Sequence, residues 1–174
     1  MHSMDELVRC AAQLGKSLEA RGRMIVTVES CTGGMIAMAL SETPGSSAWL
    51  DRGFVTYTNE AKVELVEVPP ALIAENGAVS REVACAMAIG GLKRAPMAFL
   101  ALSVTGIAGP SGGTVAKPVG TVVHGFAWRS SAQDLLSRVQ ARHYPGDRRE
   151  VRLAASIFAL RQGLLLLDEA LPGG

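Results

Sequence analysis

The chain contains 174 residues, 48% of them hydrophobic and 19% charged, which excludes intrinsic disorder and predicts one globular domain over residues 1–174. Lys and Arg number 17 and Asp and Glu number 16, so the net charge is +1. This balance excludes the strongly basic surface by which proteins bind nucleic acid through general electrostatic attraction.

The first half of the chain predicts helices that alternate with strands. Apolar residues recur every three or four positions from Leu7 to Leu18, which predicts one face of an amphipathic helix ending near Ala20. Apolar and β-branched runs then predict buried strands, and two adjacent prolines precede a further short helical segment. In order, we predict a strand over Met24–Val28, a helix over Met35–Leu40, a strand over Phe54–Thr58 and a helix over Glu60–Val66.

The second half predicts the rest of the sheet and two longer helices. Ser80 and Asp147 have side chains suited to helix N-caps. We predict helices over Arg81–Lys93 and from Asp147 to about Leu167, and strands over Phe99–Val104, Thr121–Trp128 and Leu135–Tyr144. A short polar turn joins the last two strands, which predicts a hairpin. The expected fold is therefore a three-layer α/β/α domain with a mixed, mainly parallel sheet.

Cysteine usage and hydropathy predict the cellular location of the protein. Cys10, Cys31 and Cys85 lack the spacing of metal or redox motifs, and an odd cysteine count without an export pattern favours the cytoplasm. No apolar run reaches the ~18 residues of a membrane span, so we expect no membrane association. Residues 1–3 precede a second Met, and we expect them to be disordered or a remnant of cloning.

A serine directly follows the first predicted strand, in the segment Ser30-Cys31-Thr32-Gly33-Gly34. At such a strand–helix junction, Ser30 can attack a carbonyl carbon while neighbouring backbone N–H groups hold the resulting oxyanion. A simpler interpretation is that Ser30 caps the helix and the glycines form a tight turn. Cys31 is a rival nucleophile, although its usual partner is a histidine and none of the three histidines lies near this motif.

A second segment, Tyr57-Thr58-Asn59-Glu60-Ala61-Lys62, offers a base for the serine. Lysine replaces histidine in Ser–Lys pairs, provided that burial or nearby positive charge lowers its pKa well below ~10.4. The Tyr57 hydroxyl both donates and accepts hydrogen bonds, so it can relay or orient the proton. The alternative is that Lys62 is exposed on a helix and Tyr57 only fills a strand.

Two further segments suggest contacts with an anionic ligand. A glycine-rich stretch, residues 106–113, follows a predicted buried strand, where α/β sheets bind anions and nucleotides. It lacks the Gly-Lys-Ser/Thr of a Walker loop, and its glycine spacing is not that of the Rossmann fingerprint. Arg148 falls in the first turn of the last predicted helix, where positive charge is unfavourable unless it serves a ligand. A flexible surface loop and a solvated run of charges are the alternatives for these two segments.

Taken together, these motifs resemble the CinA C-terminal domain family in its stand-alone amidohydrolase form. The matching segments occur in the family's order along nearly the whole chain: residues 29–34, 44–47, 53–62, 77–80, 105–110, 117–121 and 146–148. The resemblance implies a three-layer α/β/α fold, usually oligomeric, and no metal or other cofactor. It also implies hydrolysis of the carboxamide of nicotinamide mononucleotide, a small-molecule substrate, to nicotinate mononucleotide and ammonia in a bacterial cytoplasm.

The resemblance also implies roles for individual residues. Ser30 would be the nucleophile, Lys62 its base and Tyr57 a catalytic partner. The substrate would be bound by residues from each motif, namely Thr32, Gly33, Gly34, Asn59, Thr105, Gly106, Gly109 and Arg148. The sequence leaves open whether the substrate's phosphate binds the glycine-rich loop or Arg148. It also leaves open a non-catalytic nucleotide-binding or regulatory module, linked to competence or DNA damage.

Overall fold

The structure, a computed structural model, describes residues 2–131 and 134–172. Its strands are β1 (Met24–Glu29), β2 (Leu50–Val55), β3 (Ala98–Gly106), β4 (Thr121–Arg129) and β5 (Leu135–His143). They form one sheet in the order β2-β1-β3-β4-β5. β1 pairs in parallel with β2 and β3, whereas β4 is antiparallel to both β3 and β5. The expected mixed sheet is confirmed, and so is the hairpin formed by its last two strands.

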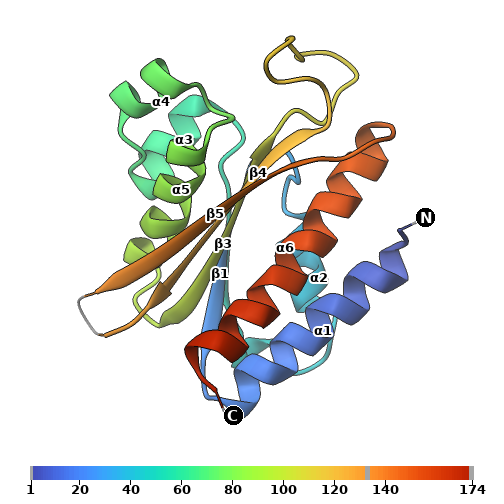
Figure 1. The fold of residues 1–174 in the computed structure, drawn as a ribbon. Helices are drawn as coiled ribbons and strands as arrows, with labels where there is room; N and C mark the ends of the chain where they lie inside the picture. Colours follow the sequence, from blue (N-terminus) through green and yellow to red (C-terminus); the bar gives the residue numbers. More distant parts are fainter. Residues whose placement is uncertain (1, 132–133, 173–174) are drawn as a thin grey trace.

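Helices cover both faces of the sheet (Figure 1). One layer contains α1 (Met4–Ala20), α2 (Met35–Ser41) and α6 (Arg148–Ala170), and the other contains α3 (Asn59–Val66), α4 (Pro70–Asn76) and α5 (Arg81–Arg94). A 3-10 turn, Ser46–Ala48, leads into β2. Apolar side chains of α1, α2 and α6 pack on one face of the sheet, and those of α3, α4 and α5 pack on the other. The three-layer α/β/α fold is therefore confirmed.

The position of β2 corrects one prediction. We expected a strand over Phe54–Thr58, but β2 begins four residues earlier, at Leu50, and ends at Val55. β2 lies at the edge of the sheet, and its charged start, Asp51 and Arg52, lacks the apolar pattern that marks a buried strand. Pairing with β1, rather than local composition, therefore sets where this strand begins.

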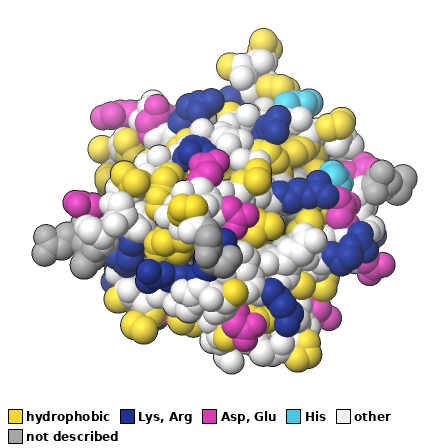
Figure 2. All heavy atoms as spheres, turned by 60° about the horizontal axis from the view of Figure 1, so that its bottom comes forward, with side chains coloured by type: hydrophobic (Ala, Val, Ile, Leu, Met, Phe, Trp, Pro, Cys, Tyr) yellow, Lys and Arg dark blue, Asp and Glu magenta, His cyan; other side chains and the backbone are white. Residues whose placement is uncertain are grey.

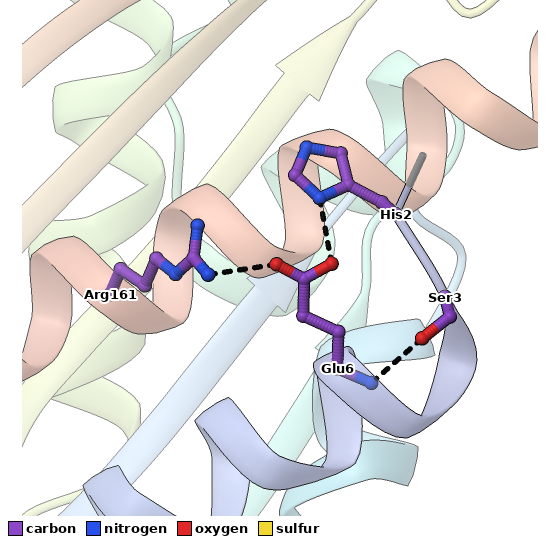
Figure 3. A network of polar contacts seen from close by, with 4 residues as sticks. All are labelled: His2, Ser3, Glu6 and Arg161. Carbon is purple, nitrogen blue, oxygen red and sulfur yellow. Dashed lines mark hydrogen bonds and ion pairs between the residues drawn. The ribbon is translucent and has the colours of Figure 1, made fainter.

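The N-terminal end of α1 is fastened to α6 by a small polar network (Figure 3). Ser3 caps α1 by accepting a hydrogen bond from the Glu6 N–H at 3.1 Å. The Glu6 carboxylate lies 2.9 Å from His2 Nδ1 and 2.8 Å from Arg161 Nη2 on α6. His2 and Ser3 thus take part in defined contacts, while residue 1, the first of the three expected to be disordered, lies outside the described residues.

Four loops meet at one edge of the sheet. The chain leaves β1, β2, β3 and β5 at this edge, and β4 and α6 begin there. From β1 the chain runs to β2 on one side, and from the neighbouring β3 it runs to β4 on the other. In open α/β sheets, ligands bind in the crevice that such diverging connections leave at the carboxyl ends of the strands. The segments singled out in the sequence lie at this edge.

The opposite end of the molecule has a mixed surface. Figure 2 shows the face that lies at the bottom of Figure 1, where cationic and anionic side chains are interspersed among apolar ones. This distribution agrees with a net charge of +1. Within residues 2–131 and 134–172, none of the helices combines the length and apolar character that crossing a bilayer requires.

Candidate active site

Ser30 lies in a tightly fixed turn between β1 and α2. Its backbone N–H donates to the Val104 carbonyl of β3 at 2.9 Å, which ties the residue to the sheet. Gly33 and Gly34 then have φ values of +60° and +91°, in the left-handed region that glycine adopts without steric cost. This turn, residues 31–34, leads directly into α2, which begins at Met35. The Ser30 side chain is only 8% exposed.

Glu29 supplies the N-terminal cap that α2 lacks at its own first residue. The cap position is Gly34, which has no side chain to accept a hydrogen bond. The Glu29 carboxylate, buried completely, instead accepts the N–H groups of Gly34 at 3.1 Å, Ile36 at 3.1 Å and Ala37 at 2.8 Å. Negative charge at a helix N-terminus is favourable. A single side chain next to Ser30 thus holds the start of the following helix.

Lys62 reaches the serine from the other helical layer. It belongs to α3, whose N-cap Thr58 accepts the Ala61 N–H. Lys62 Nζ lies 3.2 Å from Ser30 Oγ and donates to the Thr56 carbonyl at 3.0 Å. The carbonyls of Tyr57 and Thr58 lie 3.4 Å from the same nitrogen. The two predicted partners, 32 positions apart in the chain, are therefore in direct contact.

Burial changes the acid–base chemistry of Lys62. The side chain is 1% exposed, and its four hydrogen-bond partners are uncharged oxygens. Desolvation disfavours the charged ammonium and lowers the pKa of Lys62 from its ordinary value of 10.5. The alternative of an exposed, solvated lysine is therefore wrong. A lysine with a lowered pKa can accept a proton from a neighbouring hydroxyl.

Tyr57 and Arg148 meet at the mouth of the site. The Tyr57 hydroxyl accepts a hydrogen bond from Arg148 Nη2 at 2.7 Å, and Arg148 Nη1 donates to the Gly109 carbonyl at 2.8 Å. The Tyr57 ring is 54% exposed, whereas its backbone carbonyl lies 3.5 Å from Ser30 Oγ. Arg148 therefore joins the loop after β2 to the glycine-rich loop after β3, while the residue itself is exposed to solvent.

Gly33 and Gly34, which we expected to bind the substrate, use their backbone N–H groups within the turn after Ser30. The Gly33 N–H donates to the Ser30 carbonyl at 3.0 Å, and the Gly34 N–H donates to Glu29. These two N–H groups are therefore engaged within the turn and are not free for a ligand. Within the part of the chain that the structure describes, the N–H groups of Cys31 and Thr32 donate to no oxygen.

Thr105 lies near the end of β3, and Asn59 begins α3. Thr105 is 1% exposed, and its hydroxyl donates to the Ala78 carbonyl at 2.9 Å, which links the end of β3 to the loop before α5. Asn59 is exposed and lines a separate cavity of about 500 Å³ between α3 and α4. The substrate contacts that the family resemblance implies for these two residues stay a prediction.

The two glycines of the third motif have distinct positions. Gly106 ends β3 opposite Val122, where a Cβ atom would come within 2.9 Å of the Thr121 carbonyl. Gly109 has a φ of +83° and precedes a cis peptide bond to Pro110. Glycine is therefore required at both positions for backbone reasons. Only Gly109 contacts another predicted site residue, through the hydrogen bond from Arg148.

A cavity of about 620 Å³ lies beside Arg148 and the glycine-rich loop. Its walls come from the start of α6, the loop after β3 and the first residue of α2, namely Gly146, Asp147, Arg148, Arg149, Arg152, Ala108, Pro110, Val119 and Met35. This volume is within the range of ~300–1,000 Å³ that is usual for small-molecule sites. Three arginines along one wall suit an anionic ligand.

The structure does not favour the Cys31 thiol as the nucleophile, and the three histidines contact other residues. Burial raises the pKa of the Cys31 thiol to about 12, so it is not a thiolate at neutral pH. The histidines have other partners: His2 contacts Glu6, His124 contacts the Tyr144 hydroxyl and His143 contacts the Val119 carbonyl. Burial lowers the pKa of His124 to about 3, so it is uncharged at neutral pH.

Two residues at the site were missed from the sequence. Arg152, on α6, donates from Nε to the Cys31 carbonyl at 3.0 Å and from Nη2 to the Thr32 carbonyl at 2.9 Å. Glu29 caps α2, as described above. The acid directly before Ser30 was a possible signal for Glu29. The contacts of Arg152 span 120 residues or more and leave no local pattern in the sequence.

The fold and the site define a class of protein: an α/β domain with a serine directly after its first strand, at the carboxyl edge of a mixed sheet. This serine contacts a buried lysine whose other hydrogen-bond partners are backbone carbonyls. Residues 8–167 match the family described as the CinA C-terminal domain. The chain therefore belongs to this family, and the resemblance seen in its motifs is confirmed.

Relatives of known name cover most of the chain. It is 46% identical over 156 residues to the nicotinamide-nucleotide amidohydrolase PncC of Escherichia coli (strain K12), covering 90% of this chain and 92% of that protein. The protein of the same name from Pseudomonas putida is 44% identical over 164 residues, covering 94% and 98%. A CinA-like protein of Geobacter sp. (strain M21) is 48% identical over 163 residues, but this chain covers only 38% of its length.

Solved structures show the same fold. The competence/damage inducible protein CihA from Agrobacterium tumefaciens superposes with a TM-score of 0.85 at 43% identity, covering 94% of this chain and 96% of that one. A CinA superfamily protein from Klebsiella pneumoniae 700603 gives a TM-score of 0.86 at 32% identity, covering 94% and 98%. The architecture described above is thus that of the family.

Proposed function

We propose that this protein is a nicotinamide-nucleotide amidohydrolase, which converts nicotinamide mononucleotide and water to nicotinate mononucleotide and ammonia. The activity that gives relatives at 44% and 46% identity their name supports the reaction. The observation that carries the proposal is the contact of 3.2 Å between Lys62 Nζ and Ser30 Oγ in a buried site. A hydroxyl beside a base of lowered pKa can be activated as a nucleophile.

The proposed first step is acylation of Ser30. Lys62, uncharged, accepts the Ser30 proton while Oγ attacks the carboxamide carbon and the carbonyl electrons move to oxygen. The N–H groups of Cys31 and Thr32 are the donors available to this oxyanion, and each such donor contributes about 3–4 kcal/mol in comparable sites. The C–N bond then breaks, and Lys62 returns the proton to the departing nitrogen, which leaves as ammonia.

The second step releases the acid. Water attacks the Ser30 ester, Lys62 accepts a proton from that water, and the proton returns to Ser30 Oγ as the ester bond breaks. Tyr57 is the second candidate for proton delivery because its hydroxyl is held by Arg148 at 2.7 Å. The step restores the enzyme and requires only water as co-reactant.

The sequence left two candidate sites open for the phosphate of the substrate, the glycine-rich loop and Arg148, and both line one cavity. Arg148 and Arg149 line this cavity together with Ala108 and Pro110 of the glycine-rich loop. An arginine fork matches phosphate oxygens in geometry as well as charge. We therefore assign the phosphate to the cavity between the start of α6 and the glycine-rich loop.

The test is release of ammonia from nicotinamide mononucleotide by the purified chain. Ser30→Ala should lower kcat by at least about 10³-fold and Lys62→Ala by about 10²–10⁴-fold, since a general base contributes about 10²–10⁴-fold and the nucleophile more. Lys93→Ala, at the exposed end of α5, is the matched control and should keep full activity. Binding without any ammonia release by the unaltered chain would instead identify a nucleotide-binding module. Circular dichroism confirms that each variant is folded.

A further inference from the structure

Arg152 joins α6 to the turn that carries Ser30. Its guanidinium donates twice, from Nε to the Cys31 carbonyl at 3.0 Å and from Nη2 to the Thr32 carbonyl at 2.9 Å. Hydrogen bonds from a charged donor are roughly twice as strong as neutral ones, and a two-point contact also fixes orientation. The side chain therefore constrains two successive peptide groups immediately after the nucleophile.

The same helix also holds the other loops of the site. Arg148 lies one helical turn before Arg152, so the two side chains share a face of α6. Arg148 contacts Tyr57 and Gly109, while Arg152 contacts the turn after Ser30. The first two turns of α6 thus connect the loops that follow β1, β2 and β3.

The orientation of an oxyanion donor follows from the Arg152 contact. In a trans peptide group the C=O and the next N–H point in opposite directions. Arg152 binds the Cys31 carbonyl, so it sets the direction of the Thr32 N–H on the other side of that peptide. The Ser30 carbonyl, bound by the Gly33 N–H, sets the direction of the Cys31 N–H in the same way.

We propose that Arg152 is a positioning residue, which orients the Thr32 N–H toward the transition state of the amidohydrolase reaction. The inference rests on the proposed function. Glu29 fixes the far side of the same turn through the N–H groups at the start of α2. Arg152 therefore acts through the backbone and is not required to touch the substrate.

The competing role is direct binding of substrate, since Arg152 also lines the cavity of about 620 Å³. The two roles differ in their kinetic signatures. A group that binds substrate and transition state equally raises KM when removed, whereas a group needed only in the transition state lowers kcat. A displacement of 1 Å at a reacting centre costs about 10²-fold in rate.

The experiment compares Arg152→Ala with Arg161→Ala as the matched control. Arg161 lies on the same helix, but its guanidinium pairs with Glu6 at the surface (Figure 3). Arg152→Ala should lower kcat about 10²-fold with little change in KM, and millimolar guanidinium ion should restore part of the rate. Arg152→Lys should remain slow, because one ammonium lacks the planar fork that reaches both carbonyls. Arg161→Ala should keep its rate and show no response to guanidinium.

A rise in KM with unchanged kcat would make Arg152 a substrate ligand and overturn the inference, as would full activity of Arg152→Ala. A second readout separates this inference from the proposed function. The rate at which a fluorophosphonate probe labels Ser30 depends on the nucleophile and its oxyanion donors, but not on the natural substrate. Slower labelling of Arg152→Ala supports the positioning role even if nicotinamide mononucleotide is not hydrolysed, and unchanged labelling contradicts it.

Discussion

Lys62 is a cation-forming residue in a site that disfavours the cation. Its nitrogen contacts Ser30 Oγ and three backbone carbonyls, and the side chain is 1% exposed. The carbonyls stabilise an ammonium by accepting hydrogen bonds, but removal from water outweighs them and lowers the pKa of Lys62. The residue is thus fixed in place by groups that do not neutralise it, which suits a base that gains and loses a proton in each cycle.

The lowered pKa of Lys62 predicts a pH profile. In the proposed mechanism the uncharged amine is the active form of the base, so kcat/KM should rise with pH and level off above the Lys62 pKa. Because that pKa lies below 10.5, the rise should be complete before free lysine would titrate. Ammonia release measured across a pH series gives the profile. An activity that falls as pH rises through this range would show that protonated Lys62 is the working form.

At the level of single elements, α2 depends on a residue outside it. The helix is seven residues long, and its cap position Gly34 offers no side-chain acceptor. Glu29 replaces the missing cap by accepting three N–H groups from the end of the preceding strand. The end of β1, the Ser30 turn and the start of α2 therefore form one hydrogen-bonded unit.

This unit predicts the effect of Glu29→Gln. The amide NH₂ would face backbone N–H groups that need an acceptor, so the free energy of unfolding should fall by about 1–3 kcal/mol. Urea unfolding measures the loss. Glu42→Gln, at the exposed C-terminal end of the same helix, is the control and should change stability by less than about 0.5 kcal/mol. Equal stabilities of the two variants would show that Glu29 does not cap the helix.

Elements with a local sequence pattern could be predicted from the sequence, whereas β2 lacks such a pattern. The amphipathic repeat of α1 and the N-caps Ser80 and Asp147 are encoded within a few residues, and all three are confirmed. β2 depends on pairing with β1, so its start was misplaced. Because β2 ends at Val55, residues 56–58 leave the sheet, and their carbonyls accept hydrogen bonds from Lys62.

At the scale of the whole molecule, the site is assembled from segments far apart in the chain. The Ser30–Lys62 contact was predicted because lysine is a known substitute for the missing histidine. The roles of Arg152 and Glu29 were not predicted, because they depend on how α6 packs across the sheet edge and on where α2 begins. The substrate contacts expected for Thr105 and Asn59 stay predictions: Thr105 donates to the Ala78 carbonyl, and Asn59 lines the cavity between α3 and α4.

The contact between α1 and α6 predicts how stability changes with pH. The hydrogen bond from His2, the largest cause, and the nearby charges of His2 and Arg161 lower the pKa of Glu6 from 4.5. A carboxyl with a lowered pKa in the folded state stabilises the fold above its unfolded pKa and loses that effect as pH falls through the folded value. The difference in unfolding free energy between the unaltered chain and Glu6→Gln should therefore shrink between pH 7 and pH 3. Urea unfolding at both pH values measures it, and a constant difference would contradict the assignment.

The most direct test of the account is to look for the covalent intermediate on Ser30. The protein is mixed with nicotinamide mononucleotide, quenched with acid at successive times and analysed by mass spectrometry after digestion. If Ser30 is the nucleophile and Lys62 its base, the peptide containing Ser30 gains the mass of the substrate less ammonia, and Lys62→Met shows no such gain. Ammonia release with the Ser30 peptide unmodified at every time point, or an adduct on another residue, would contradict it.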